Sequence, residues 1–150
     1  MSALTETRRG TPRRAQALRG GLALVAAAQA DTGIWGLLAP RSFFRDFPGA
    51  GHHWVAGLGP YNEHLIRDYA ATELGFAVLL LGAAIWFERR LVLVAGIAFL
   101  AATLPHFAYH LTTTDSLSTT DNAASLGAFG LVALAMLGVM RGSTHREAST

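Results

Sequence analysis

Four apolar stretches of nearly membrane-spanning length limit the folds open to this chain. They cover residues 22–39, 70–87, 91–109 and 123–140. A bilayer core of about 30 Å is crossed by roughly 20 apolar residues in a helix, and lipid excludes backbone whose polar groups lack internal partners. We therefore predict an all-α integral membrane protein with four transmembrane helices.

The composition supports a single membrane domain. Hydrophobic residues make up 51% of the 150 residues and charged residues only 15%. The expected parts are a basic tail at 1–19, an outer loop at 40–66 and a second tail at 141–150. With no cysteine, the chain has no disulfide, no thiolate metal site and no cysteine nucleophile. No nucleic-acid motif accompanies the basic residues, so they suit the anionic surface of a lipid bilayer better than nucleic acid.

Arginine residues gather on one side of the predicted bundle. This side carries Arg8, Arg9, Arg13, Arg14, Arg19, Arg89, Arg90, Arg141 and Arg146. The opposite side has three arginines balanced by acidic residues, then a loop with Asp115 and Asp121 and no basic residue. The positive-inside rule therefore predicts that both termini lie in the cytoplasm. A cleavable signal peptide is the alternative for the first span, but its apolar run continues as far as Leu38, which favours a retained helix.

The connections between the spans lead to three further expectations. The link at 88–90 is so short that the second and third spans should be antiparallel neighbours. The long loop at 40–66 is rich in aromatic residues and should lie along the membrane interface, with Pro60 as the first residue of the second helix. Small residues should bring the last span close to another helix: Ala124, Gly127, Ala128, Gly130, Ala135 and Gly138.

Asp31, Glu73 and His106 are polar residues inside three different predicted spans. At about 1.5 Å per residue they lie at similar depths, roughly 10 Å below the outer surface. A charged side chain near a helix centre costs about 2.5 to 3.5 kcal/mol on insertion scales, so each acid requires a partner, a proton or water. We expect the three to form one polar layer.

Two histidines on the third span are candidate metal ligands. His106 and His110 are four residues apart and therefore share a helix face. With a carboxylate from Glu73 or Asp31 they would supply the nitrogen and oxygen donors that zinc, iron or manganese accept. The two histidines cannot be opposite axial ligands of one haem, which would need another ligand such as His64.

The outer half of the second span carries further polar residues. His64, Asp68 and Thr72 form one stripe, and Tyr69 and Glu73 form another. A structural interpretation of the polar layer is a hydrogen-bonded knot that fixes the helix register. A proton path or a pocket for a small substrate is the functional alternative.

The run 44–68, FRDFPGAGHHWVAGLGPYNEHLIRD, and the later PHFAYH at 105–110 resemble an uncharacterised family of small four-helix membrane proteins from actinobacteria. The resemblance spans roughly residues 31–125. It implies the four-helix membrane fold and a shared outer site made of Tyr61, Asn62, Glu63, His64, Asp68, His106 and His110. We expect the protein to lie in a bacterial plasma membrane. The resemblance implies no activity. Members of that family often carry another histidine after the HxxxH pair, where this chain has threonine at 112–114. A looser likeness to DoxX-type proteins rests on architecture alone.

These features leave three functions open. The first is a membrane protein whose outward-facing pocket holds a divalent metal or a small polar ligand. The second is a non-enzymatic accessory subunit that packs against a membrane-protein partner or forms a homo-oligomer. The third is a membrane enzyme acting on a lipid or quinone, with Glu73 or Asp31 as acid or base beside His106. Whether the chain is an enzyme stays open, because no nucleophile or phosphate-binding motif is present.

Overall fold

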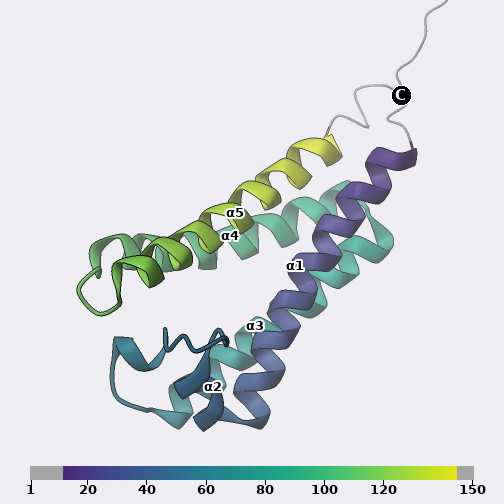
Figure 1. The fold of residues 1–150 in the computed structure, drawn as a ribbon. Coiled ribbons are helices and arrows are strands. Elements are labelled where there is room, and N and C mark those ends of the chain that lie inside the picture. Colours follow the sequence, from purple (N-terminus) through teal and green to yellow (C-terminus); the bar gives the residue numbers. More distant parts are fainter. Residues whose placement is uncertain (1–11, 145–150) are drawn as a thin grey trace, which may run out of the picture.

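A computed structural model describes residues 12–144 of the chain. These residues form helices without any strand, in the order α1 (Pro12–Leu38), α2 (Pro40–Asp46), the short 3-10 helix η1 (Ala56–Leu58), α3 (Glu63–Trp86), α4 (Arg89–Thr112) and α5 (Thr119–Thr144) (Figure 1). Four of the helices are long and apolar enough to cross a membrane. The predicted all-α fold class with four spans is therefore confirmed.

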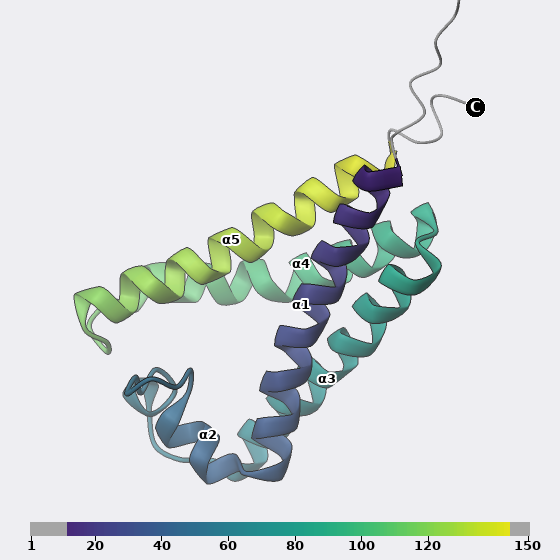
Figure 2. The ribbon, with the colours of Figure 1, turned by 45° about the vertical axis from the view of Figure 1, so that its right-hand side comes forward.

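The four long helices form two antiparallel pairs. Helix α1 packs along α3, and α4 packs along α5. The pairs meet at the end of the bundle that holds the start of α1, the α3–α4 turn and the end of α5, and they diverge toward the other end (Figures 1 and 2). We call the end where the pairs meet the terminal end, and the end where they diverge the loop end. The second and third spans, expected to be neighbours, thus pack together mainly near their connecting turn.

Two glycines allow the closest helix contact. A Cβ atom on Gly33 of α1 would lie 2.8 Å from the backbone oxygen of Ala70 and 2.8 Å from the backbone nitrogen of Leu74. A Cβ on Gly36 would lie 2.6 Å from the Cβ of Ala70. Lipid provides no hydrophobic drive for association, so this close backbone approach is what joins α1 to α3.

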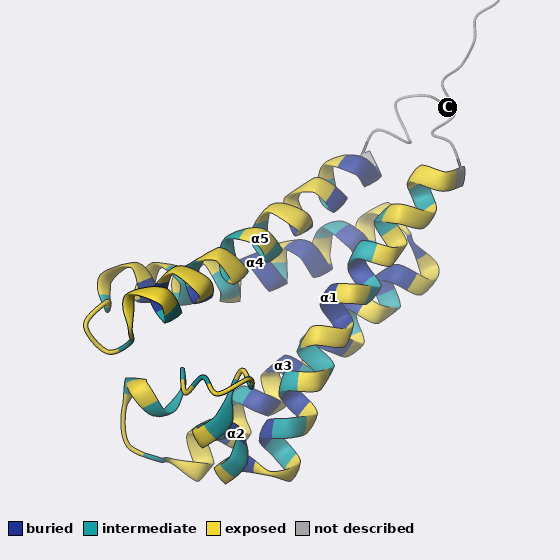
Figure 3. Ribbon diagram, viewed as in Figure 1, coloured by how far each residue is buried: buried dark blue, intermediate teal, exposed yellow. Residues whose placement is uncertain are grey.

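The apolar core lies at the terminal half of the bundle. Leu22, Leu80, Val92 and Met136 come from the four long helices and are all at most 1% exposed. The outward faces of the same helices are exposed along their length (Figure 3). The guanidinium group of Arg19 closes this end by donating to the carbonyl oxygen of Ile85 at 3.1 Å and by lying over the ring of Phe87.

The predicted start of the second span is wrong. Helix α3 begins at Glu63 and not at Pro60, because Asn62 caps it: its side-chain oxygen accepts a hydrogen bond from the Leu65 amide at 3.1 Å. Helix α1 includes residues 12–19, so the second half of the expected basic tail is helical. Arg8, Arg9 and Arg146 lie outside the described residues.

The small residues of α5 do not pack as expected. Nothing lies within 4 Å of a Cβ built on Gly127, Gly130 or Gly138. The helix instead faces α4 with larger residues. A Cβ atom built on Gly96 of α4 would lie only 2.5 Å from the sulfur atom of Met140. The glycine that permits contact between these two helices is therefore on α4, and Gly127 and Gly138 of α5 face outward.

The outer loop is an ordered aromatic unit attached to α1 and α3. Phe43 of α2 is 1% exposed, with its ring centroid 5.7 Å from that of Trp35 and 6.3 Å from that of Tyr69. The ring of Phe47 extends the cluster to Trp54, with 6.2 Å between the two ring centroids. The predicted aromatic loop is thus packed against the loop end of the α1–α3 pair.

Candidate functional site

Glu73 is the centre of a hydrogen-bonded group between α1 and α3. Its side chain is buried, with only 9% of the residue exposed. The Gln29 amide nitrogen donates to one of its carboxylate oxygens, and the Tyr69 hydroxyl is a second hydrogen-bond partner. Two donors from two helices thus satisfy the Glu73 carboxylate within the predicted second span.

The two candidate metal ligands on α4 converge. The Nε2 atoms of His106 and His110 lie 3.1 Å apart, and their rings are stacked with a 4.9 Å separation of the centroids. The ring of Phe129 on α5 covers both, with centroids 4.7 Å from His106 and 5.2 Å from His110. The histidine pair is therefore held between α4 and α5.

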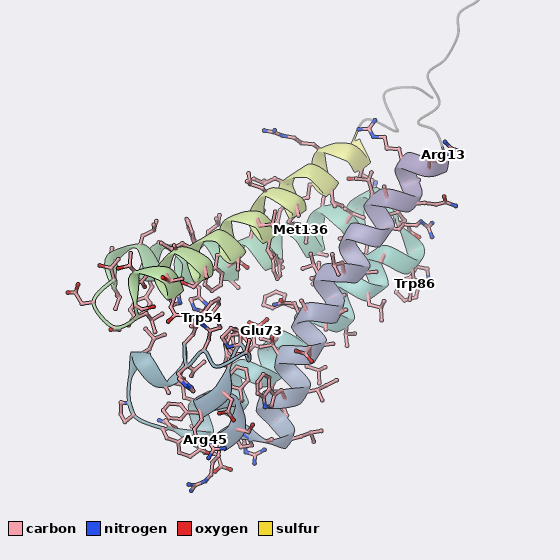
Figure 4. All side chains as sticks on the ribbon, viewed as in Figure 1. Arg13, Arg45, Trp54, Glu73, Trp86 and Met136 are labelled. Carbon is pink, nitrogen blue, oxygen red and sulfur yellow. The ribbon has the colours of Figure 1, made fainter. Side chains whose placement is uncertain are left out.

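Tyr69 connects the carboxylate to the histidine pair. Its ring lies edge-on to that of His106, with 6.3 Å between the centroids. We use the name inner polar cluster for Gln29, Tyr69, Glu73, His106 and His110. Its members come from α1, α3 and α4. Glu73 lies where the two helix pairs have begun to separate (Figure 4).

His110 has an unused polar atom. The residue is only 5% exposed, and its Nδ1 atom is buried without a hydrogen-bond partner. Buried polar groups in native proteins nearly always have a partner, and an exception calls for an explanation such as a ligand, an ion or water. Within residues 12–144, this unpartnered Nδ1 atom distinguishes His110 from the other members of the cluster, and it is not the ring nitrogen that faces His106.

The spacing of the two Nε2 atoms fits chelation of one metal ion. At metal–nitrogen distances of about 2.0–2.1 Å, a 3.1 Å separation gives a nitrogen–metal–nitrogen angle of roughly 95–100°. This angle lies between those of octahedral and tetrahedral coordination. Within residues 12–144, however, no three His, Asp or Glu side chains gather in a metal-binding group. Glu73 therefore does not join the pair as a third direct ligand in this arrangement.

Asp31 lies outside the inner polar cluster. It is exposed, and it makes no hydrogen bond or ion pair with the rest of the described chain. Residues two apart on a helix point about 200° apart, so Gln29 faces α3 and Asp31 faces away. The expected layer of Asp31, Glu73 and His106 thus contains Gln29 in place of Asp31. The pattern that indicates Gln29 is its position on the same face as Gly33, the residue that contacts α3.

The other predicted site residues remain at the outer end of α3. His64 and Asp68 are exposed and form an ion pair across one helical turn at 3.3 Å. Glu63 pairs with Arg67 at 3.0 Å and accepts a hydrogen bond from the Tyr61 hydroxyl at 3.0 Å. Together with the capping role of Asn62, these contacts organise the start of α3. They do not extend to the inner polar cluster.

Electrostatics keep the Tyr61 phenol in its donor form. Desolvation and the neighbouring Glu63 carboxylate raise the pKa of the Tyr61 hydroxyl. The phenol is therefore protonated at neutral pH and donates to Glu63, which itself holds Arg67. Arg67 in turn donates to the carbonyl oxygen of Leu37 at 2.6 Å, and this contact joins the loop ends of α1 and α3.

Comparisons with protein-family models, curated proteins and solved structures give no match to this chain.

Proposed function

We propose that this protein is a multi-pass membrane protein that binds a divalent transition-metal ion through His106 and His110. The observation that carries the proposal is the 3.1 Å convergence of the two Nε2 atoms on one face of α4. Neutral imidazole is a common ligand of zinc, iron, nickel and copper ions. The four apolar spans support a membrane location for the site.

The surroundings of the pair favour an open metal site. Two histidines fill only part of a coordination shell, so water or an oxygen of a bound substrate would complete it, which is the arrangement of catalytic sites more than of structural ones. Tyr69 and Glu73 lie on the neighbouring helix, where they could orient such a ligand by hydrogen bonds. The proposed substrate is accordingly a small molecule with an oxygen donor.

Titration with Co²⁺ tests this function. The protein purified in detergent is expected to bind about one Co²⁺ per chain with visible absorption bands typical of nitrogen ligation. His106→Ala and His110→Ala should each weaken binding by about a hundred-fold or more, because each removes a direct ligand, and loss of an outer-shell partner alone costs about ten- to a hundred-fold. His64→Ala is the matched control, because His64 is also four residues from a polar partner on a helix but is exposed.

The control variant makes the result specific. His64→Ala should bind Co²⁺ as the parent protein does. Equal loss in all three variants would indicate surface binding. Absence of stoichiometric Co²⁺ in the parent protein would contradict the proposed function.

We further propose that the chain lies in a bacterial plasma membrane with both termini in the cytoplasm. The arginines at the terminal end support this orientation, including Arg13 and Arg14 on α1 and Arg90 on α4. In this orientation the metal site lies in the outer half of the membrane. Its ligands would then reach it from the outside of the cell.

The outward face of α5 favours a second candidate function, that of a subunit in a membrane complex. Within residues 12–144, a Cβ built on Gly127, Gly130 or Gly138 would meet nothing within 4 Å, and Leu131 and Leu134 are about 70% exposed. Small residues on a lipid-facing side permit close helix packing with a partner or a second copy. A tagged chain extracted in mild detergent should then migrate as an assembly that Gly130→Leu dissociates. A solitary monomer in both cases would argue against it.

A further inference from the structure

One carboxylate joins the outer loop to the α4–α5 pair. Oδ1 of Asp121, on the first turn of α5, accepts a hydrogen bond from Nε1 of Trp54 at 2.9 Å and lies 2.6 Å from Nδ1 of His52. Its other oxygen accepts a hydrogen bond from the Ser118 hydroxyl at 2.7 Å. Asp121 is therefore bonded on one side to its own helix start and on the other to a loop nearly 70 residues earlier in the chain.

A second contact lies beside the first. A Cβ atom on Gly57 would lie 2.6 Å from a methyl carbon of Leu117 and 3.1 Å from the carbonyl oxygen of Ser116. A glycine at this position lets η1 approach the α4–α5 turn, whereas a larger residue would require the Leu117 side chain to shift. The outer loop thus touches the start of α5 through Trp54, His52 and Gly57.

These contacts span the end of the bundle where the two helix pairs diverge. The loop lies between the outer end of the α1–α3 pair and the turn that joins α4 to α5 (Figures 1 and 2). Trp54 is on the side of the loop that faces α5 (Figure 4). On the other side, the ring of Phe47 packs against the rings of Trp54 and of Trp35 on α1, with 6.2 Å between the ring centroids in each pair. The loop is therefore anchored to α1 and reaches across to α5.

We propose that residues 47–61 form a strap that controls access from the loop end to the inner polar cluster. Its anchored side is an aromatic cluster, whereas its link to α5 consists of two hydrogen bonds to one carboxylate and the Gly57 contact. The weaker side opens first, because local opening follows the smallest set of contacts. The strap goes beyond the proposed metal site and does not depend on which ligand binds there.

Two glycines turn the chain at the start of the strap. Gly49 and Gly51 have φ angles of +102° and +84°, which glycine reaches without a steric penalty. Beyond this turn the Trp54 amide donates to the carbonyl oxygen of Phe47 at 2.9 Å. Opening therefore breaks the link at Asp121 while Phe47 and Trp54 stay together.

Thiol labelling in the cysteine-free chain tests the strap. A single reporter, Thr103→Cys, lies three residues before His106 on the same face of α4, and its reaction with a small water-soluble thiosulfonate is followed in nanodiscs, where both membrane sides are accessible. Adding His52→Ala and Trp54→Phe removes both hydrogen bonds of the link but keeps the Gly57 contact, the Ser118 contact of Asp121 and an aromatic ring at position 54. Labelling should become about ten-fold faster or more, since each lost hydrogen bond weakens the closed state.

Matched variants separate opening from general loosening. Asp46→Ala also removes an acid from the outer loop region, but Asp46 bonds only to its own helix through Ser42 and Arg45. This variant should label at the parent rate. Asp115→Cys, in the exposed α4–α5 turn, gives the rate of a freely accessible thiol.

The outcomes are decisive whether or not Co²⁺ binds. The strap proposal is overturned if the reporter protein with His52→Ala and Trp54→Phe labels at the parent rate. It is also overturned if Asp46→Ala accelerates labelling as much as the double substitution does. If the double substitution disturbs folding, Trp54→Phe alone should accelerate labelling by a smaller factor, and no change in a folded Trp54→Phe protein would also overturn it. Failure of the Co²⁺ titration concerns the proposed function and leaves these rates as an independent result.

Discussion

Gly33→Val is expected to separate α1 from α3 and to cause the largest loss of stability among single substitutions at a glycine. The first side-chain carbon would lie 2.8 Å from two backbone atoms of α3, and backbone cannot move aside as a flexible side chain can. Overpacking of this kind costs about 3 kcal/mol or more when the neighbours cannot relax. The measurement is the thermal unfolding midpoint in detergent, together with the yield of monodisperse protein.

Gly127→Val is the matched control. It introduces the same side chain into a spanning helix, at a position where nothing lies within 4 Å of the added carbon. Its unfolding free energy should change by less than about 0.5 kcal/mol, as for most surface substitutions. If Gly33→Val unfolds at the same temperature as Gly127→Val, the close contact between α1 and α3 is wrong.

The second large effect is expected at Glu73, and it should differ from the effect at Asp31. Glu73→Leu leaves the Gln29 amide and the Tyr69 hydroxyl without their acceptor, at a cost of about 1–3 kcal/mol for each orphaned group. Asp31→Leu removes an exposed carboxylate that has no partner in residues 12–144, so stability in the membrane should be unchanged or raised. Unfolding in mixed micelles measures both variants.

A double-mutant cycle isolates the contact itself. Gln29→Leu and Glu73→Leu should show a coupling free energy of about 0.5–3 kcal/mol, because each removes the partner of the other. Gln29→Leu combined with Asp31→Leu should be additive. Equal destabilisation by Glu73→Leu and Asp31→Leu would mean that α1 is rotated from the orientation described above.

The four spans could be predicted from the sequence, because apolar length is a local quantity that locates each helix. The rise per residue predicts similar depths for Glu73 and His106, and Tyr69 contacts both side chains. The shared face of His106 and His110 follows from helix periodicity in the same way. Their convergence to 3.1 Å is consistent with that spacing.

The rotation of each helix about its axis was harder to predict. In lipid, apolar residues are equally at home on packed and lipid-facing sides, so hydrophobicity does not mark the buried face. The better indicator is the set of small residues on a face that also carries a polar residue, as with Gly33 and Gln29 on α1. On α5 the small residues alone were misleading, since Gly127 and Gly138 face outward.

Contacts between distant segments were beyond sequence reasoning. The link from Trp54 to Asp121 joins residues 67 positions apart, and no periodicity relates them. The start of α3 shows a local competition instead. Asn62 offers a capping oxygen to the Leu65 amide, and this cap prevails over the preset φ of Pro60.

The inner polar cluster combines a structural part and a binding part. Gln29, Glu73 and Tyr69 satisfy one another and hold α1 in register with α3. His106 and His110 form the proposed binding part, because their Nε2 atoms converge to 3.1 Å. The metal proposal therefore depends on the histidine pair, with Tyr69 as the contact between the two parts.

Pulsed electron paramagnetic resonance of the Cu²⁺-loaded protein tests the histidine pair most directly, because the distal nitrogen of each coordinated imidazole produces its own modulation of the signal. The account predicts that two imidazoles bind one Cu²⁺ in the parent protein and that only one remains in His110→Ala. A spectrum without imidazole modulation, or one that is identical in the parent, His106→Ala and His110→Ala proteins, would contradict it.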